Sequence, residues 1–298
     1  MWLADKLGYF KDNGLSVDIQ YYASGAPALE AGISGAWQAG WIGAPPALTA
    51  GLKTGLISAG LQIEEGPNQV MMARKKDMAG KTPAELLKGA KVLVVVNSTS
   101  QQVLNGCLQK FGVSASDIEV TPLEPPAIVQ AFQAGQGTVA MTWSEVDYPL
   151  LESDDYVKIC DGVEAGVKVY CTFIVQPTFW KDHPEQAAAY IDAAYRANEY
   201  ITDHPDEAAT HLVEYYTSIG QSYNLEQAKL ALSLRTWYSL DQTIQEYEDG
   251  SAQKGLQATE DYFIDSGTWT DKPDVGAIVK DGLEVLKAAK DYRDQHRS

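Results

Sequence analysis

The feature that most constrains this chain is a pair of small-residue turns, each placed between an apolar run and a helix. One turn covers residues 24–30 and follows the run 17–21, and the other covers residues 43–48 and follows the run 37–42. In both turns glycine ends the run and proline falls in the first turn of the helix, where its missing N–H removes no hydrogen bond. Each turn therefore predicts a helix start that follows a strand.

A helix start of this kind is suited to binding an anion. Its first backbone N–H groups have no partner within the helix, and the helix dipole places roughly half a positive charge there. A turn of small residues also lets an anionic group approach the backbone closely. The alternative is that both are ordinary strand–helix turns of an α/β domain.

The second part of the chain repeats the order of the first. Residues 92–96 form an apolar run typical of a parallel strand, residues 97–101 cap a helix, and Pro125 and Pro126 open another helix before the strand 138–143. The first copy has no opening strand and begins with a helix at residues 2–10. We therefore expect that a strand normally precedes Met1 and is missing here.

The remaining segments extend this alternating pattern and end in helices. We expect further strands at residues 15–22, 56–61, 70–73, 118–123 and 167–175, and helices after residue 177. The pairs His183-Pro184 and His204-Pro205 indicate helix entries rather than catalytic histidines, because proline is favoured in the first helical turn.

The net charge argues against one class of partner. A formal charge of −17 leaves no basic stripe that would bind nucleic acid. No run of about 18 apolar residues occurs, so we expect no membrane span. The N-terminal residues have neither the basic start nor the apolar core of a secretory signal, which predicts either a cytoplasmic protein or a chain without its leader.

The three cysteines predict no metal site. Cys160 and Cys171 flank a loop between two strand-like runs and either form a disulfide or stay reduced, whereas Cys107 lies in a helical pattern as a small core residue. The cysteine spacing fits no zinc pattern, and the four histidines add no cluster. No Ser/His/Asp or Cys/His grouping is present either, so we expect neither a cofactor nor an enzyme.

Several short stretches spread over most of the chain match the pattern of a known family. No single stretch is specific for that family, but their order and spacing are. The stretches are residues 2–10, 13–15, 24–29, 40–46, 97–100, 133–136, 141–143 and 179–185. In this pattern the chain resembles the nitrate/sulfonate/taurine type of substrate-binding proteins of ABC importers, which are built on the type II periplasmic binding fold.

The resemblance implies an α/β fold of two lobes, each a mixed, mainly parallel sheet flanked by helices, with a ligand cleft between them. The chain would cross between the lobes near residues 70–75 and 169–176. Lobe one would then be the discontinuous unit of residues 1–73 and 176–298, and lobe two would be residues 74–175.

The resemblance also implies a ligand site made by turns from both lobes. The residues that match it one by one are Trp2, Ser24, Gly25, Ala26, Gly43, Ala44, Pro45, Ser98, Thr99, Ser100 and Trp143. The turns would offer amides and hydroxyls to the acidic group of the ligand, and the two tryptophans would line the cleft. Core packing is the alternative for Trp143, and residues 136–138 depart from the family, whose members usually have an acidic residue there.

Neutral donors would meet the charge of the ligand, because no Arg or Lys lies in these turns. The negative field of the whole protein is screened within about 8 Å at physiological salt, so the local amides dominate. Glu64, Glu65 and Glu145 have two interpretations. They either reach the cleft mouth, where one would pair with the ammonium group of a taurine-like ligand, or are solvated surface charges.

The function implied by the resemblance is that of a monomeric, periplasmic or extracytoplasmic solute-binding protein. It would close on a small organic anion or zwitterion and deliver it to an ABC permease in the membrane. A pyrimidine precursor or an aromatic acid is the alternative ligand. The alternative functions are a ligand-sensing module and an enzyme of the thiamine-pyrimidine-synthase type, whose iron site and cysteine-rich motif have no counterpart here.

Overall fold

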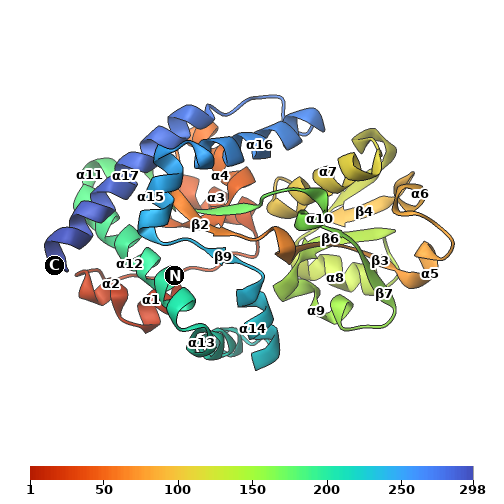
Figure 1. The fold of residues 1–298 in the computed structure, drawn as a ribbon, viewed down its shortest axis with the longest axis horizontal. Helices are drawn as coiled ribbons and strands as arrows, with labels where there is room; N and C mark the ends of the chain where they lie inside the picture. Colours follow the sequence, from red (N-terminus) through yellow and green to blue (C-terminus); the bar gives the residue numbers. More distant parts are fainter. Residues whose placement is uncertain (298) are drawn as a thin grey trace.

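The computed structural model describes residues 1–297, apart from the side chains of Ser144 and Glu145, as two lobes that each contain a sheet flanked by helices (Figure 1). The α/β prediction is therefore confirmed. The strands are β1 Ala39–Gly43, β2 Ile57–Glu64, β3 Gln69–Arg74, β4 Lys91–Val94, β5 Glu119–Pro122, β6 Val139–Trp143, β7 Tyr156–Asp161, β8 Tyr170–Val175 and β9 Thr236–Trp237.

Helices follow the strands in the first two thirds of the chain and then dominate. The helices before β8 are α1 Trp2–Lys6, α2 Tyr9–Asp12, α3 Gly25–Ile33, α4 Ala44–Thr54, α5 Lys75–Met78, α6 Pro83–Leu87, α7 Thr99–Phe111, α8 Pro125–Gln133, α9 Ser144–Leu151 and α10 Gly162–Ala165, with short 3-10 turns at Gly66–Asn68 and Ala115–Asp117. The later ones are α11 Pro177–Asp182, α12 Pro184–Asp203, α13 Pro205–Ser218, α14 Leu225–Ser233, α15 Leu240–Glu248, α16 Ser251–Asp265 and α17 Val275–His296. No helix in the described part of the chain is both long and apolar enough to span a membrane.

Lobe one is built on the four-stranded sheet β1-β8-β2-β9. Strand β8 lies between β1 and β2 and runs antiparallel to both. The mainly parallel pairing expected for this lobe is therefore wrong, because β2 leads away toward lobe two and β8 returns from it in the opposite direction. The C-terminal helices cover this sheet closely. A methyl group built on Gly282 of α17 would lie 2.1 Å from the carbonyl oxygen of Ser58 in β2.

Lobe two is built on the five-stranded sheet β5-β4-β6-β3-β7. Strand β4 pairs in parallel with β5 and β6, as its apolar run predicts, and Val92, Leu93 and Val94 are buried. Strand β3 pairs antiparallel with β6 and β7. Figure 1 shows this lobe in neighbouring colours of the bar, from orange through yellow to green, because it is almost one continuous stretch of chain.

The strand pairing moves both crossings from the expected positions. β3 lies in the sheet of lobe two and β8 in the sheet of lobe one, so the boundaries after residues 73 and 175 assign each strand to the wrong lobe. The crossings instead lie near residues 64–69 and 166–170, where the N–H of Glu65 donates to the carbonyl of Val169 at 2.8 Å. A run of strand-like residues shows that a strand exists but not which sheet pairs with it.

Two expectations near the N-terminus also change. Residues 15–22 form no strand, because no other strand in the described chain pairs with their backbone. Leu15 and Val17 still pack against the lobe-one core, which explains the alternating pattern. The helix expected over residues 2–10 is divided into α1 and α2 at Gly8, whose φ is 77°. The strand expected before Met1 remains an expectation.

Candidate functional site

The starts of three helices from the two lobes come together. A methyl group built on Gly25, at the start of α3, would lie 2.9 Å from Cγ of Pro46 in α4. A methyl group built on Gly43, the N-cap of α4, would lie 2.9 Å from Cγ2 of Thr99, the first residue of α7. Because α3 and α4 belong to lobe one and α7 to lobe two, the junction between the lobes gathers three sets of first-turn amides.

The two helix starts of lobe one have no side-chain cap. Ser24 is the extended N-cap of α3, yet its hydroxyl makes no capping bond, and its Oγ is buried without a hydrogen-bond partner. Gly43 has no side chain to cap α4, whose first turn contains proline. A buried hydroxyl without a partner is costly. Ser24 is therefore a polar group that a ligand can satisfy.

The helix start of lobe two is capped by its own side chain. The hydroxyl of Ser98 accepts a bond from the N–H of Gln101 at 3.3 Å. The hydroxyl of Ser100 donates to Oε1 of Gln69 at 2.7 Å and so points toward the crossing segment. Thr99 lies between these two serines and contacts the start of α4. The predicted hydroxyls of Ser98 and Ser100 thus already have partners within the protein.

The remaining turn residues differ in exposure. Ala44 and Pro45 are buried, Gly25 and Gly43 are half-buried, and Ala26 is exposed. Small side chains are thus what allow the three helix starts to approach one another. Larger residues at Gly25 or Gly43 would collide with α4 or α7.

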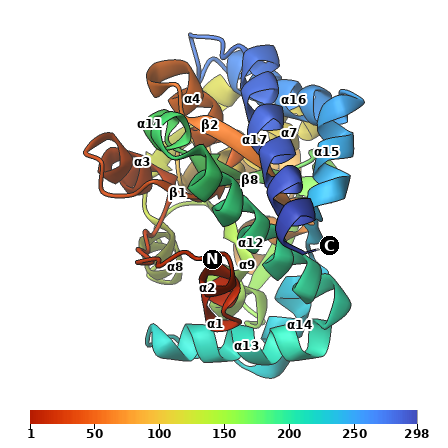
Figure 2. The same cartoon turned by 90° about the vertical axis from the view of Figure 1, so that its left-hand side faces the viewer.

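The two predicted tryptophans lie in different surroundings. Trp2 of α1 packs against Tyr215 of α13 with a ring-centroid distance of 5.5 Å, and the two helices lie side by side in Figure 2. The ammonium group of Lys6 lies 5.2 Å from the Trp2 ring. Trp143 is the N-cap of α9 and packs against the lobe-two core, which favours the core-packing alternative. The side chain of Glu145 lies outside the described residues.

The carboxylates of Glu64 and Glu65 hold the crossing segments. Glu64 accepts bonds from the backbone N–H of Gly66 at 2.9 Å and of Val169 at 3.2 Å, so it joins the two crossings. Glu65 is 7% exposed and forms an ion pair with Arg235 at 3.1 Å. Neither expected role, pairing with a ligand or carrying a solvated charge, describes these contacts. Arg235 was missed because an isolated arginine between α14 and β9 gives no local signal.

Further hydrogen bonds join the two lobes. Asn97 donates to Oγ1 of Thr49 at 3.1 Å and accepts a bond from the indole N–H of Trp269 at 3.0 Å. The hydroxyl of Tyr148 in α9 donates to the carbonyl of Gln227 in α14 at 3.1 Å. These contacts join residues far apart in the sequence and connect the two lobes directly.

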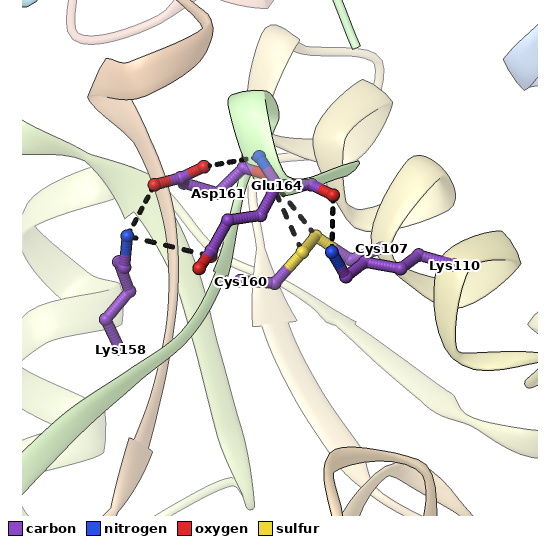
Figure 3. Close-up of a disulfide and its surroundings, with 6 residues drawn as sticks. All are labelled: Cys107, Lys110, Lys158, Cys160, Asp161 and Glu164. Atoms are coloured by element: carbon purple, nitrogen blue, oxygen red, sulfur yellow. Dashed lines mark hydrogen bonds and ion pairs between the residues drawn. A yellow bond between two sulfur atoms is a disulfide. The ribbon is translucent and has the colours of Figure 1, made fainter. Parts of the chain in front are cut away.

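A disulfide fixes the helix that lobe two contributes to the site (Figure 3). Cys107 of α7 is joined to Cys160 of β7, so the alternative that pairs Cys160 with Cys171 is wrong. Cys160 faces the core beneath α7, whereas Cys171 lies on β8 in the other lobe, where its thiol contacts Oε1 of Glu65 at 3.4 Å. Beside the disulfide, Asp161 accepts a bond from the N–H of Glu164. Within the described residues, no group of three or more His, Cys, Asp or Glu is arranged to hold a metal ion.

Two α/β lobes with two crossings between them, and with helix starts of both lobes meeting at the junction, define the class of two-lobed binding-protein folds. The chain belongs to the NMT1/THI5-like family, whose profile matches residues 1–208. The taurine-binding periplasmic protein of Escherichia coli (strain K12) is 28% identical over 201 residues, which are 66% of this chain and 61% of that relative. The chain thus spans less than two thirds of this relative's length.

Solved structures support the same fold. The alkanesulfonate-binding protein SsuA of Xanthomonas axonopodis pv. citri, bound to MOPS, superposes with a TM-score of 0.77 at 17% identity, covering 93% of this chain and 92% of that one. The periplasmic aliphatic sulphonate binding protein SsuA of Escherichia coli gives 0.71 at 19% identity, covering 92% and 85%. At these identities the likeness establishes the architecture of the lobes.

Proposed function

We propose that this protein captures a small organic sulfonate between its lobes and delivers it to the permease of an ABC importer. The observation that carries the proposal is the convergence of the α3, α4 and α7 starts at the junction of the lobes. Their backbone amides can bind the sulfonate anion with neutral hydrogen-bond donors, so no positively charged side chain is needed. The buried, unpartnered hydroxyl of Ser24 adds a further polar group at the α3 start.

The relatives agree with this ligand class. The names of the relative and of the two structural neighbours specify taurine, alkanesulfonate and aliphatic sulphonate. All three ligands carry a sulfonate group, whereas their other ends differ. We therefore infer only the shared sulfonate head group for the ligand of this chain, and we assign its binding to the turns at the starts of α3, α4 and α7.

The mechanism follows from the contacts between the lobes. A ligand that touches Gly43 in lobe one and Thr99 in lobe two gains both sets of contacts only in the closed state. It therefore shifts the population toward closure in proportion to its differential affinity. The closed surface is then what a permease would recognise.

Three further properties belong to the proposal. The disulfide Cys107–Cys160 favours an oxidising, extracytoplasmic compartment. The ligand is carried as a cargo, so no catalytic step is needed. The protein acts as a monomer, because the three helix starts that would hold the ligand all come from one chain.

A thermal-shift panel tests the proposal. The protein is heated with taurine, ethanesulfonate, benzenesulfonate, nitrate, aliphatic and aromatic carboxylates and an aminopyrimidine, each near 1 mM. A sulfonate bound at micromolar strength adds about 4 kcal/mol to the stability of the folded state, a rise on the order of ten degrees at this size. If only carboxylates, nitrate or the aminopyrimidine raise the melting temperature, the sulfonate assignment is wrong.

A matched pair of glycine variants tests the location. Gly43→Ala places a methyl group 2.9 Å from Thr99 and should weaken sulfonate binding at least tenfold by opposing closure. Gly40→Ala on the same strand is the control, because its methyl group would lie 3.9 Å from the nearest atom, Cγ1 of Ile174. Titration calorimetry measures both, and equal affinities in the two variants would place the ligand elsewhere.

A further inference from the structure

The exposed aromatic side chains are confined to one region of the molecule. The chain has seven tryptophans, sixteen tyrosines and six phenylalanines. Among the described residues only Tyr21, Tyr22 and Trp41 are exposed, at 51%, 36% and 48%. All three lie within three residues of Ser24 or Gly43, the N-caps of α3 and α4. Aromatic surface is thus left uncovered where the helix starts meet.

The backbone geometry places Trp41 on the same face of β1 as Gly43, the N-cap of α4. Trp41 and Gly43 are both in strand β1, and residues two apart in a strand point to the same face. Ile42 between them points to the opposite face, where it is 5% exposed and lies beside Gly25 at the start of α3. The indole of Trp41 therefore lies on the face of β1 from which Gly43 contacts Thr99.

The neighbouring tyrosine is held in place by other rings. Tyr21 packs against Tyr215 of α13 at a centroid distance of 5.7 Å, and Tyr215 packs against Trp2 at 5.5 Å. Such tilted ring pairs restrict side-chain motion before any ligand arrives. Lobe one therefore presents an ordered aromatic surface beside its anion-binding turns.

The third helix start also has an exposed apolar side chain near it. Val96, two residues before the N-cap Ser98 of α7, is 42% exposed. Two of the three carboxylates expected to receive an ammonium group are committed elsewhere, since Glu64 accepts two backbone N–H groups and Glu65 pairs with Arg235. The surroundings suit a ligand with a flat apolar tail better than one with an amine.

We propose that the site selects sulfonates carrying an aromatic ring, the arylsulfonates, over taurine and short alkanesulfonates. This inference rests on the proposed function, since the sulfonate group occupies the helix starts. Trp41 and Tyr21 face the ring, and the specificity resides in these side chains rather than in the turns.

Titration calorimetry with benzenesulfonate, ethanesulfonate and taurine tests the inference. We expect benzenesulfonate to bind at least tenfold more tightly than either of the other two. Trp41→Ala should reduce this preference to less than threefold while changing the affinity for ethanesulfonate by less than threefold. Trp41→Leu, which keeps apolar bulk without a flat ring, provides a second variant if the alanine variant does not fold.

Leu52→Ala is the matched control. Leu52 is similarly exposed, at 43%, but lies near the C-terminal end of α4, away from its start. It should leave the preference for benzenesulfonate unchanged. Ethanesulfonate or taurine binding as tightly as benzenesulfonate would overturn the arylsulfonate inference and leave the proposed function standing. If none of the three sulfonates binds, both the inference and the proposed function are wrong.

Discussion

The two lobes are stabilised by different means. In lobe one, buried tyrosines from late helices hydrogen bond to the backbone of β2: Tyr195 donates to Leu61 at 2.9 Å and Tyr247 to Ser58 at 3.4 Å. In lobe two, the disulfide Cys107–Cys160 joins α7 to β7. The sheet of lobe one depends on segments more than a hundred residues away, and polar side chains fix their positions. Lobe two is nearly continuous and is cross-linked covalently.

Alkaline pH should produce the largest difference in stability between the lobes, because it should destabilise lobe one. Burial raises the pKa of Tyr247 to about 12, and it also raises the pKa of Tyr190 and Tyr195 well above the ordinary value. The unfolded chain ionises these tyrosines near pH 10 while the folded chain does not, so stability is lost as the pH rises from 10 through 12. Tyr247 alone accounts for about 2 kcal/mol by pH 12.

Urea unfolding followed by tryptophan fluorescence measures this effect. The signal reports mainly on lobe one, because six of the seven tryptophans lie there and Trp143 lies in lobe two. Tyr247→Phe is the control and should flatten part of the pH dependence. A stability that stays constant from pH 9 to 11.5 would contradict the account of lobe one.

Loss of the disulfide should act on lobe two. Replacing Cys107 and Cys160 by serine removes a cross-link over a sequence separation of 53 residues and should cost about 2–4 kcal/mol. Hydrogen exchange at neutral pH, resolved by peptide, should show faster exchange in β4, β6 and α7 than in β2 and β8. Cys171→Ser, outside the disulfide, controls for the loss of a thiol. Equal acceleration in both lobes would show that they unfold as one unit.

A methyl group at the α17–β2 contact should act on lobe one. Gly282→Ala places it 2.1 Å from the carbonyl oxygen of Ser58 and should destabilise lobe one by about 1–3 kcal/mol. Gly276→Ala on the same helix has its nearest neighbour at 3.4 Å and should be neutral or stabilising, because alanine favours helix. Chemical unfolding compares the two, and the same loss in both would trace the effect to the helix rather than to its packing.

The sequence predicts those parts of the fold that depend on local chemistry. The helix starts at Ser24, Gly43 and Ser98 occur where glycine, proline and serine place them. The apolar run at β4 likewise becomes a parallel strand. These features need only a few neighbouring residues, so a single sequence contains their signal.

Other features depend on partners that are distant in the sequence. Residues 15–22 alternate as a strand does, but a strand also needs a neighbouring backbone. The partner of Cys160 and the roles of Glu64, Glu65 and Arg235 follow from the packing of the crossings. The three exposed aromatic residues become recognisable only when burial is known, because most aromatic residues lie in cores.

The position of β8 between β1 and β2 bears on how the protein is made. Lobe one cannot complete its sheet until Tyr170–Val175 has left the ribosome, long after Ile57–Glu64 has emerged. By then the whole of lobe two has been synthesised and can fold first, as continuous units do during translation. Until then the incomplete lobe one exposes the unpaired edges of β1 and β2. A chaperone would therefore be most useful while this part of the chain is still being synthesised.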